Sequence, residues 1–201
     1  FAPDNLITRA EFSVIAVKAA NYKEGGSSLL FSDVPSSFWG AKYIATAAEN
    51  KLIYGYPDGS FHPGENITYA QALTILMRLL GYSSGEIGRG YPYGYIDKAQ
   101  ELGICDGLSF NADDRITRGV VALIFDRALS CDMSGTSSKL MTKMDYSLSD
   151  EVIILGSGKT DGSILADSIA TSGGTYKNNC RRIEIGCKAK LILNKDKEIV
   201  S

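Results

Sequence analysis

A twelve-residue pattern occurs three times in this chain and limits the folds that it can adopt. The copies span residues 1–12, 61–72 and 110–121, and each has Phe at its first position, Ile at its seventh and Thr at its eighth. They are separated by 60 residues (61 minus 1) and 49 residues (110 minus 61). Similarity at such periods is typical of units that cannot bury their apolar faces alone and pack against one another. We therefore expect neighbouring units, with the chain beginning inside the first.

A helical pattern begins at the threonine of each copy. Thr8–Ala20, Thr68–Leu80 and Thr117–Ser130 have apolar residues at helical spacing. In the first two copies a glutamate or glutamine stands three residues after the threonine, which predicts a capping box. The third copy keeps the threonine and has a valine in place of the reciprocal partner.

Two further helices are predicted between the copies. They cover Trp39–Asn50 and Tyr91–Leu102, and we expect the first of them to pair with the helix from Thr68 to Leu80. The loop at 54–61 contains Pro57-Asp58-Gly59, which is typical of a turn. Each full unit is thus expected to be a helix, a turn-rich loop and a second helix.

The pattern changes after Ser130. Residues 132–138 are a Gly- and Ser-containing segment that we expect to be a linker. The segment Gly156–Thr160 lacks the first glycine of a phosphate-binding loop, so a hairpin turn is expected there. Ser201 follows an apolar pair directly, from which we expect a longer protein. The runs that predict strands of a small β domain are Glu151–Leu155, Arg182–Ile185, Lys190–Leu193 and Glu198–Val200.

Charge and hydropathy argue against several classes of partner. The chain has 21 basic and 23 acidic residues, a net charge of −2, which offers no general attraction for nucleic acid or an anionic membrane. The longest apolar run, 72–80, carries Arg78 and is far shorter than the about 18 to 20 residues of a membrane span. The first residues lack the layout of a secretory signal.

The cysteines and the single histidine, His62, give no pattern for a metal site or a catalytic triad. We expect Cys105 and Cys131 to be packing residues, while Cys180 and Cys187 could close a hairpin loop. No catalytic residue, metal or cofactor is expected, although a pair of carboxylates for glycoside hydrolysis is defined only in space. Asp113 and Asp114 are read as loop residues.

These residues together resemble S-layer homology repeats, the cell-wall anchoring modules of many bacterial surface proteins. The matching positions occur in the family's order: Phe31-Ser32-Asp33-Val34, Trp39, residues 54–61, Pro63, Ile67-Thr68 and Leu79-Leu80-Gly81. The resemblance implies an α+β chain in which helical repeats surround a pseudo-threefold axis and a small β-rich domain follows. The implied divisions are the second half of repeat 1 (1–30), repeat 2 (31–82), a divergent repeat 3 (83–131), a linker (132–138) and the β-rich domain (139–201). That last domain is similar to the β segment of some clostridial surface proteins.

The resemblance also implies a function. In the family, grooves between repeats bind secondary cell-wall polysaccharide, often through a pyruvylated sugar, at the cell wall or S-layer of Gram-positive-type bacteria. The chain would then tether the remainder of a larger surface protein. The site residues that it implies are Arg9, Glu11, Asp33 and Trp39 in one groove and Arg118 in another. Tyr69 stands where the second copy should have arginine, and Gly119 and Val120 follow Arg118 in the third.

The proposed residues suit an acidic sugar, and each also has a structural alternative. Arg9 is placed at a helix start, where backbone amides and the helix dipole favour an anion, and its guanidinium can grip a carboxylate through two hydrogen bonds. Arg9 and Glu11 could instead form a helix cap with no ligand. Trp39 could be a sugar platform or a core anchor, and Asp33 a ligand contact or a turn residue.

The aromatic residues and the overall function also leave alternatives. The tyrosines that could extend a carbohydrate surface or only build turns are Tyr54, Tyr56, Tyr91, Tyr93 and Tyr95. Two other functions compete with anchoring: an interaction protein whose repeats have drifted, with the β domain as contact surface, and a polysaccharide-processing enzyme whose catalytic part lies outside this sequence.

Overall fold

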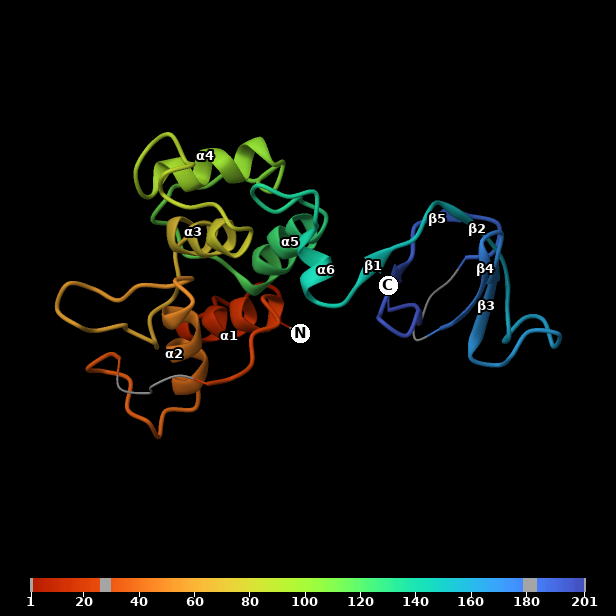
Figure 1. Ribbon diagram of the computed structural model, residues 1–201, viewed down its shortest axis with the longest axis horizontal. Helices are drawn as coiled ribbons and strands as arrows, with labels where there is room; N and C mark the ends of the chain where they lie inside the picture. Colours follow the sequence, from red (N-terminus) through yellow and green to blue (C-terminus); the bar gives the residue numbers. More distant parts are fainter. Residues whose placement is uncertain (1, 26–29, 179–183, 201) are drawn as a thin grey trace. The chain divides into compact units, whose positions relative to one another are not determined.

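The computed structural model describes residues 2–25, 30–178 and 184–200, and the chain divides into two compact units. The first, Phe1–Met144, contains the helices, and the second, Asp145–Ser201, contains the strands. The expected α+β class is therefore confirmed (Figure 1).

The five helices expected from the sequence are confirmed, each within a few residues. They begin where a side chain or a turn satisfies the first backbone amides. Both predicted capping boxes are present, and the third threonine caps its helix alone. The helices are α1 (Arg9–Ala19), α2 (Ala41–Glu49), α3 (Tyr69–Leu79), α4 (Tyr93–Glu101) and α5 (Arg118–Leu129), followed by a short α6 (Leu140–Lys143).

The three copies meet in a ring of backbone hydrogen bonds formed by their shared isoleucines. The amide of Ile67 donates to the carbonyl of Ile7 (3.0 Å), that of Ile116 to Ile67 (3.1 Å), and that of Ile7 to Ile116 (3.4 Å). Each of the three side chains is at most 1% exposed. Because each copy donates to one neighbour and accepts from the other, the ring gives the unit its pseudo-threefold arrangement.

A second set of bonds joins the start of each helix to the loop of a neighbouring copy. The first amide of α1, α3 or α5 donates to a backbone carbonyl in a neighbouring copy. That carbonyl lies four residues before the corresponding helix of the neighbour begins. The pairs are Arg9 with Glu65 (2.9 Å), Tyr69 with Asp114 (3.0 Å) and Arg118 with Asn5 (2.8 Å). These amides are therefore already satisfied within the protein, so the expectation that they would face an anion at Arg9 is wrong.

Within the helical unit, helices of neighbouring repeats pair with one another. We expected α2 to pack on α3, but α2 packs on α1 and α4 packs on α3 (Figure 1). Lys18 of α1 lies over the ring of Tyr43 in α2, 5.9 Å from its centroid, and Arg78 of α3 lies 5.3 Å from that of Tyr95 in α4. The long loop after α2 contributes the buried Phe61 and carries the chain to the next position around the axis.

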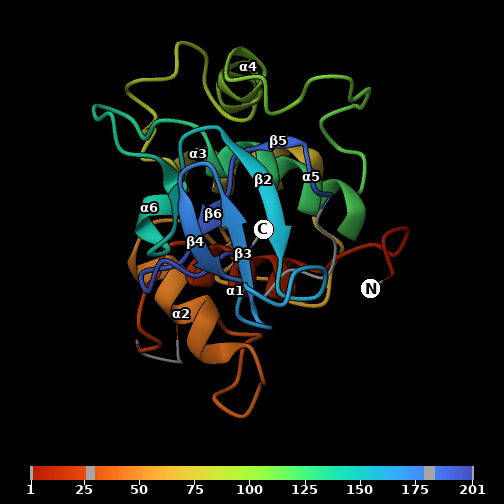
Figure 2. The same cartoon turned by 90° about the vertical axis from the view of Figure 1, so that its right-hand side faces the viewer.

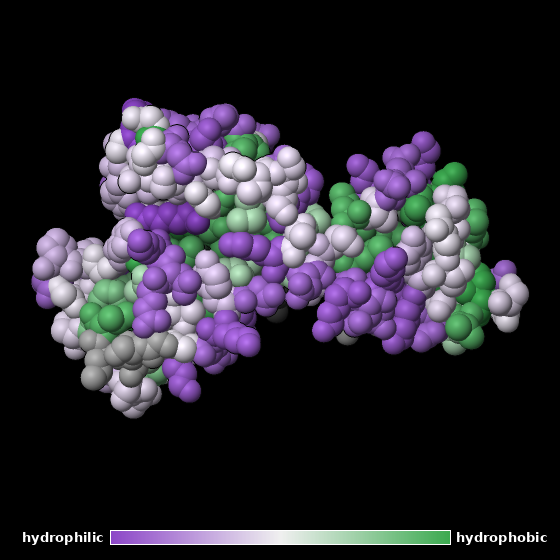
Figure 3. Space-filling view, in the orientation of Figure 1, coloured by the Kyte–Doolittle hydropathy of each residue, from purple (hydrophilic) through white to green (hydrophobic). Residues whose placement is uncertain are grey.

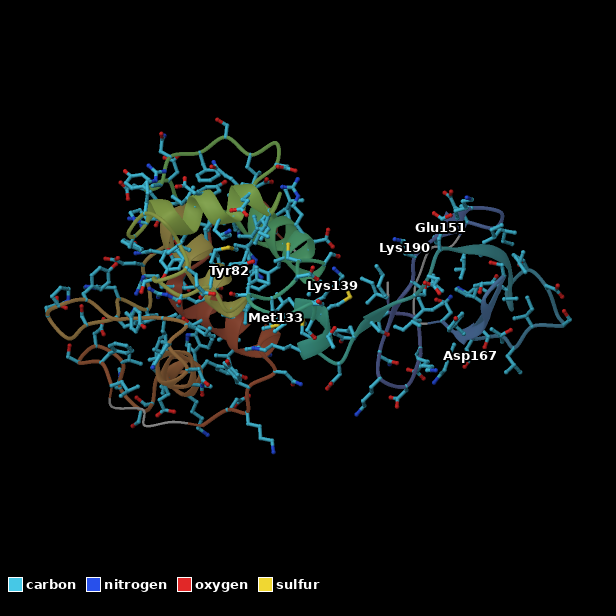
Figure 4. All side chains as sticks on the ribbon, turned by 45° about the horizontal axis from the view of Figure 1, so that its top comes forward. Tyr82, Met133, Lys139, Glu151, Asp167 and Lys190 are labelled. Carbon is cyan, nitrogen blue, oxygen red and sulfur yellow. The ribbon has the colours of Figure 1, made fainter. Side chains whose placement is uncertain are left out.

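The segment expected as a linker, residues 132–138, instead packs on the helical unit. The amide of Ser134 donates to the carbonyl of Leu80 (2.8 Å), and Lys139 Nζ donates to the carbonyl of Ser130 (2.8 Å). Met133 packs against the helical core together with Tyr82 (Figure 4). Leu140 of α6 is fully buried in that core, so the first unit extends to Met144 rather than ending near residue 138.

The second unit holds two small antiparallel sheets (Figure 2). The larger has the order β4-β3-β2-β5, and the smaller pairs β1 with β6. Strand β2 alternates buried and exposed residues, and its Val152 and Ile154 join the core of this unit. The strands are β1 (Ser147–Leu148), β2 (Val152–Ser157), β3 (Ser168–Thr171), β4 (Gly174–Lys177), β5 (Lys188–Ala189) and β6 (Ile192–Leu193).

The strand predictions were only partly confirmed. Glu151–Leu155 corresponds to β2 and Lys190–Leu193 to β6, whereas Glu198–Val200 makes isolated bridges at Ile199. Arg182–Ile185 and the pairing of Cys180 with Cys187 fall partly outside the described residues. The hairpin of β3 and β4 was missed because its sequence, with Ser, Gly and Thr among few apolar residues, is typical of a loop.

Other expectations concern the turn, the cysteines and the membrane. A turn follows β2 as predicted, where the amide of Thr160 donates to the carbonyl of Ser157 (2.9 Å). Cys105 is buried in the helical core, and Cys131 packs against it, as expected. None of the described helices is long and apolar enough to cross a bilayer.

Candidate functional site

An open cavity of about 290 Å³ lies in the helical unit, where the first copy meets the second copy and the loop that carries Tyr91. We call it the Arg9 groove. Its walls come from the start of α1, from the loop between α2 and α3 with α3 itself, and from the loop before α4. None of its described lining residues is acidic, so its charge is positive. The polar and aromatic lining residues are Arg9, Tyr54, Tyr56, Gln71, Thr74, Arg78 and Tyr91.

Arg9 is buried in the wall of this groove. Its Nε donates to the carbonyl of Phe61 (2.8 Å), and its guanidinium carbon lies 4.4 Å from the Phe61 ring centroid and 5.0 Å from that of Tyr56. Burial lowers the pKa of Arg9, and the nearby Tyr56 and Glu65 oppose that change. Within the described residues, the two terminal nitrogens make no hydrogen bond or ion pair, so they remain available to a ligand.

Asp33 holds the loop on which Arg9 rests. Its carboxylate accepts from the amides of Phe61 (2.8 Å) and His62 (2.7 Å). Burial disfavours the charged form, but these two hydrogen bonds outweigh it and keep the pKa of Asp33 below its ordinary value. Asp33 therefore fixes the carbonyl of Phe61 that orients Arg9, which is the loop-shaping role that the sequence left open.

Replacing Asp33 with asparagine is expected to lower stability at pH 7 by about 1 kcal/mol, because an amide cannot accept both hydrogen bonds. A lowered carboxyl pKa contributes stability that is present above the unfolded value, near 3.8, and lost as pH falls through the folded value. The difference between wild type and Asp33→Asn should thus shrink below about pH 4. Urea unfolding at pH 7, 5 and 3 would measure it.

The control for this series is Asp126→Asn, since Asp126 is exposed on α5. That variant should match wild type at every pH. A gap between wild type and Asp33→Asn that stayed constant down to pH 3 would contradict the role given to the carboxylate.

Arg118 lines a second, smaller cavity of about 140 Å³ whose other lining residues are apolar, and it forms an ion pair with Glu11. Arg118 Nη1 is 3.4 Å from Glu11 Oε1, while Glu11 Oε2 accepts from the amide (2.8 Å) and hydroxyl (2.9 Å) of Thr8. Glu11 is therefore a capping residue and an ion-pair partner, and it does not line the Arg9 groove.

Trp39 lies apart from both cavities. Its side chain is 61% exposed and packs at a tilt against Phe38, with ring centroids 5.4 Å apart. It is not a core anchor. Of the four residues expected in one groove, the structure brings Arg9 and Asp33 to the same loop and leaves Glu11 and Trp39 outside it.

The position equivalent to Arg9 in the second copy is filled by an aromatic stack. The ring of Tyr69 lies parallel to that of Phe110, with centroids 4.3 Å apart and planes inclined by 5°. Arg9 has the same relation to Phe61, which is the matching phenylalanine of the next copy. A ring therefore occupies the place where the first copy presents a guanidinium.

Sequence reasoning missed Arg78 and Gln71 and left the tyrosines undecided. A signal for Arg78 existed, because a basic residue follows the cap threonine by ten positions in every copy, at Lys18, Arg78 and Arg127. Nothing in the sequence showed which of the three faces a cavity. Among the described residues, no cluster of three or more His, Cys, Asp or Glu side chains could hold a metal ion.

Comparison with known proteins agrees with the repeat architecture. Residues 30–73 match the family model of the S-layer homology domain. The chain is 35% identical over 137 residues to the middle cell wall protein of Brevibacillus brevis, covering 66% of this chain and 13% of that protein. It is 32% identical over 164 residues to a cell surface protein of Thermoanaerobacter kivui (74% and 21%) and 40% identical over 84 residues to the cellulosome-anchoring protein of Acetivibrio thermocellus (40% and 19%).

The chain spans no more than 21% of the length of any of these three relatives. Their names are those of cell-wall, cell-surface and anchoring proteins, which confirms the expected location at the bacterial cell wall. From the domain match, the relatives and the ring of three repeats, the chain is an S-layer homology domain protein.

Proposed function

We propose that the helical unit is a non-catalytic anchoring module that binds an acidic secondary cell-wall polysaccharide, such as a pyruvylated one, in the Arg9 groove. The observation that supports this most is Arg9, which lines a cavity that also has tyrosines and no acidic residue among its described walls, and whose terminal nitrogens make no hydrogen bond with the described residues. The lining of the cavity carries positive charge, which a carboxylate on a sugar would neutralise.

The groove has the chemistry that an acidic sugar needs. A guanidinium can bind a carboxylate through two parallel charge-assisted hydrogen bonds, each stronger than a neutral one. Tyr54 and Tyr91 are 58% and 59% exposed, and each offers a flat apolar ring with a polar hydroxyl. Asp33 would act by positioning Arg9 through Phe61.

The same lining supports binding rather than glycoside hydrolysis. Glycoside hydrolysis generally needs a pair of carboxyl groups on either side of the scissile bond. The described walls of the groove contain none. At the second cavity Arg118 is already paired with Glu11, so an acidic ligand there would compete with an existing ion pair.

Titration with purified wall polysaccharide tests the proposal. Calorimetry would compare the native polymer with the same polymer after removal of its pyruvate ketals. We expect the native polymer to bind at least about 10-fold more tightly, since one charge-assisted hydrogen bond contributes about 1.5–3 kcal/mol. Equal affinity for both polymers would rule out recognition of the acid, and absence of binding to either would rule out the function.

A second candidate is an interaction module that binds another protein and no glycan. The Tyr69–Phe110 stack favours it, because that position has lost its cation. The β-rich unit also shows green, hydrophobic surface in Figure 3. Its exposed hydrophobic residues are Leu148, Ile153, Leu155, Leu165, Ile185 and Val200. Self-association that depends on concentration, with no affinity for the polymer, would support this alternative.

A further inference from the structure

Arg78 gives the Arg9 groove a second cation. It lies in the last turn of α3, and its guanidinium carbon is 4.4 Å from the ring centroid of Tyr54 and 5.3 Å from that of Tyr95. Its Nη1 donates to the carbonyl of Leu52 (3.3 Å). Arg78 and Tyr54 both line the groove.

Some contacts of Arg78 recur at the equivalent residues of the other copies and are therefore structural. Arg127, the equivalent residue in the third copy, donates from Nη1 to the carbonyl of Ile104 (2.9 Å), as Arg78 does to Leu52. In the first copy Lys18 lies over Tyr43, as Arg78 does over Tyr95. The contact with the carbonyl or the tyrosine thus recurs, whereas of these three residues only Arg78 lines the Arg9 groove.

The two guanidinium groups of the groove rest on different aromatic rings. Arg9 lies over Phe61 and Tyr56, and Arg78 lies over Tyr54 and Tyr95. The hydroxyl of Tyr91 is influenced by both: burial raises its pKa most strongly, and the positive charges of Arg9 and Arg78 oppose that rise. The groove therefore presents two separately held cations with a phenol near both.

We infer that Arg78 is a specificity-determining residue that binds a second acidic group of the polysaccharide, on a sugar next to the one held by Arg9. The inference rests on the proposed function and narrows it to polymers in which acidic groups follow one another closely. A second carboxylate would neutralise the second cation, and each guanidinium would make its own charge-assisted hydrogen bonds. The exposed ring of Tyr54 would support the second sugar.

Three synthetic wall-type trisaccharides test this inference: one neutral, one with a single pyruvate ketal, and one with ketals on two adjacent sugars. Calorimetry would give the Kd of each for the full chain. We expect the second ketal to tighten binding by about 10-fold or more, equivalent to one or two charge-assisted hydrogen bonds. In Arg78→Gln that gain should disappear, so that the Kd values for the single- and double-ketal probes come within about 3-fold of each other.

Two matched variants separate the possible outcomes. Arg127→Gln removes the equivalent carbonyl contact outside the groove and should leave the gain from the second ketal intact. Arg9→Gln should abolish binding of both acidic probes. If Arg78→Gln weakens both probes equally, Arg78 is only structural or shares one carboxylate with Arg9, and the inference is overturned.

The outcomes also separate this inference from the proposed function. If the single- and double-ketal probes bind wild type equally and Arg9→Gln loses both, the inference is overturned and the proposed function stands. If no probe binds wild type, both are overturned. If only the gain from the second ketal is lost in Arg78→Gln, both are supported.

Discussion

Replacement of Arg9 with alanine is expected to weaken binding of native wall polysaccharide by about 100-fold while the helical unit stays folded. The size follows from the loss of two charge-assisted hydrogen bonds to a carboxylate. The fold should persist because the cap of α1 uses Thr8 and Glu11, and the ring of isoleucine amides uses backbone only. Co-sedimentation with purified cell wall measures the first effect, and far-ultraviolet circular dichroism the second.

Two further variants sharpen this experiment. Arg9→Lys keeps the charge without the planar fork, so we expect binding to fall by about 10-fold rather than 100-fold. Arg89→Ala removes an arginine that pairs with Asp97 (2.7 Å) on the exposed surface outside the groove, and it should bind like wild type. Full wall binding by folded Arg9→Ala would remove the Arg9 groove from the proposed function.

Replacement of Tyr69 with arginine is expected to create an additional site in the second copy. The new guanidinium would take the place of the ring that now stacks on Phe110, as Arg9 lies over Phe61. The number of single-ketal trisaccharides bound per chain should rise by one. Retention on the native polymer should rise by about 10-fold or more, because two linked sites bind one polymer with a high effective concentration.

Tyr69→Phe is the matched control for this change. It keeps an aromatic ring on Phe110 and adds no charge, so its stoichiometry should equal that of wild type. A folded Tyr69→Arg variant that gains no bound ligand would contradict this prediction. In that case some feature other than the cation distinguishes the two positions, and Val120, which stands where Gln71 lines the Arg9 groove, would be the first to examine.

The local elements could be predicted from the sequence because their determinants are close together in the chain. A threonine and the glutamate or glutamine three residues later set the starts of α1 and α3, and periodic apolar residues set their lengths. The strands were predicted less well. Short runs such as β3 and β4 are stabilised by pairing with β2 and by burial of Ile169, and these are properties of the folded unit.

The candidate site was predicted in type but only partly in composition. Arg9 and Asp33 were expected, but the contact that joins them runs through the backbone of Phe61, which no side-chain pattern reveals. Glu11 forms an ion pair with Arg118, which is 107 positions away in the chain. Helices also paired in an unexpected order, with α2 on α1 and α4 on α3, because the long loop after α2 carries the chain around the axis.

The sequence by itself determined that this protein contains similar helical units that pack against one another, because each copy carries its own threonine cap and isoleucine. Only the tertiary structure shows which of the equivalent positions lines a cavity. Arg9 and Tyr69 occupy equivalent positions, but Arg9 borders a cavity, whereas Tyr69 stacks on Phe110. That difference depends on which loops of neighbouring units meet, and therefore on contacts between residues far apart in the chain.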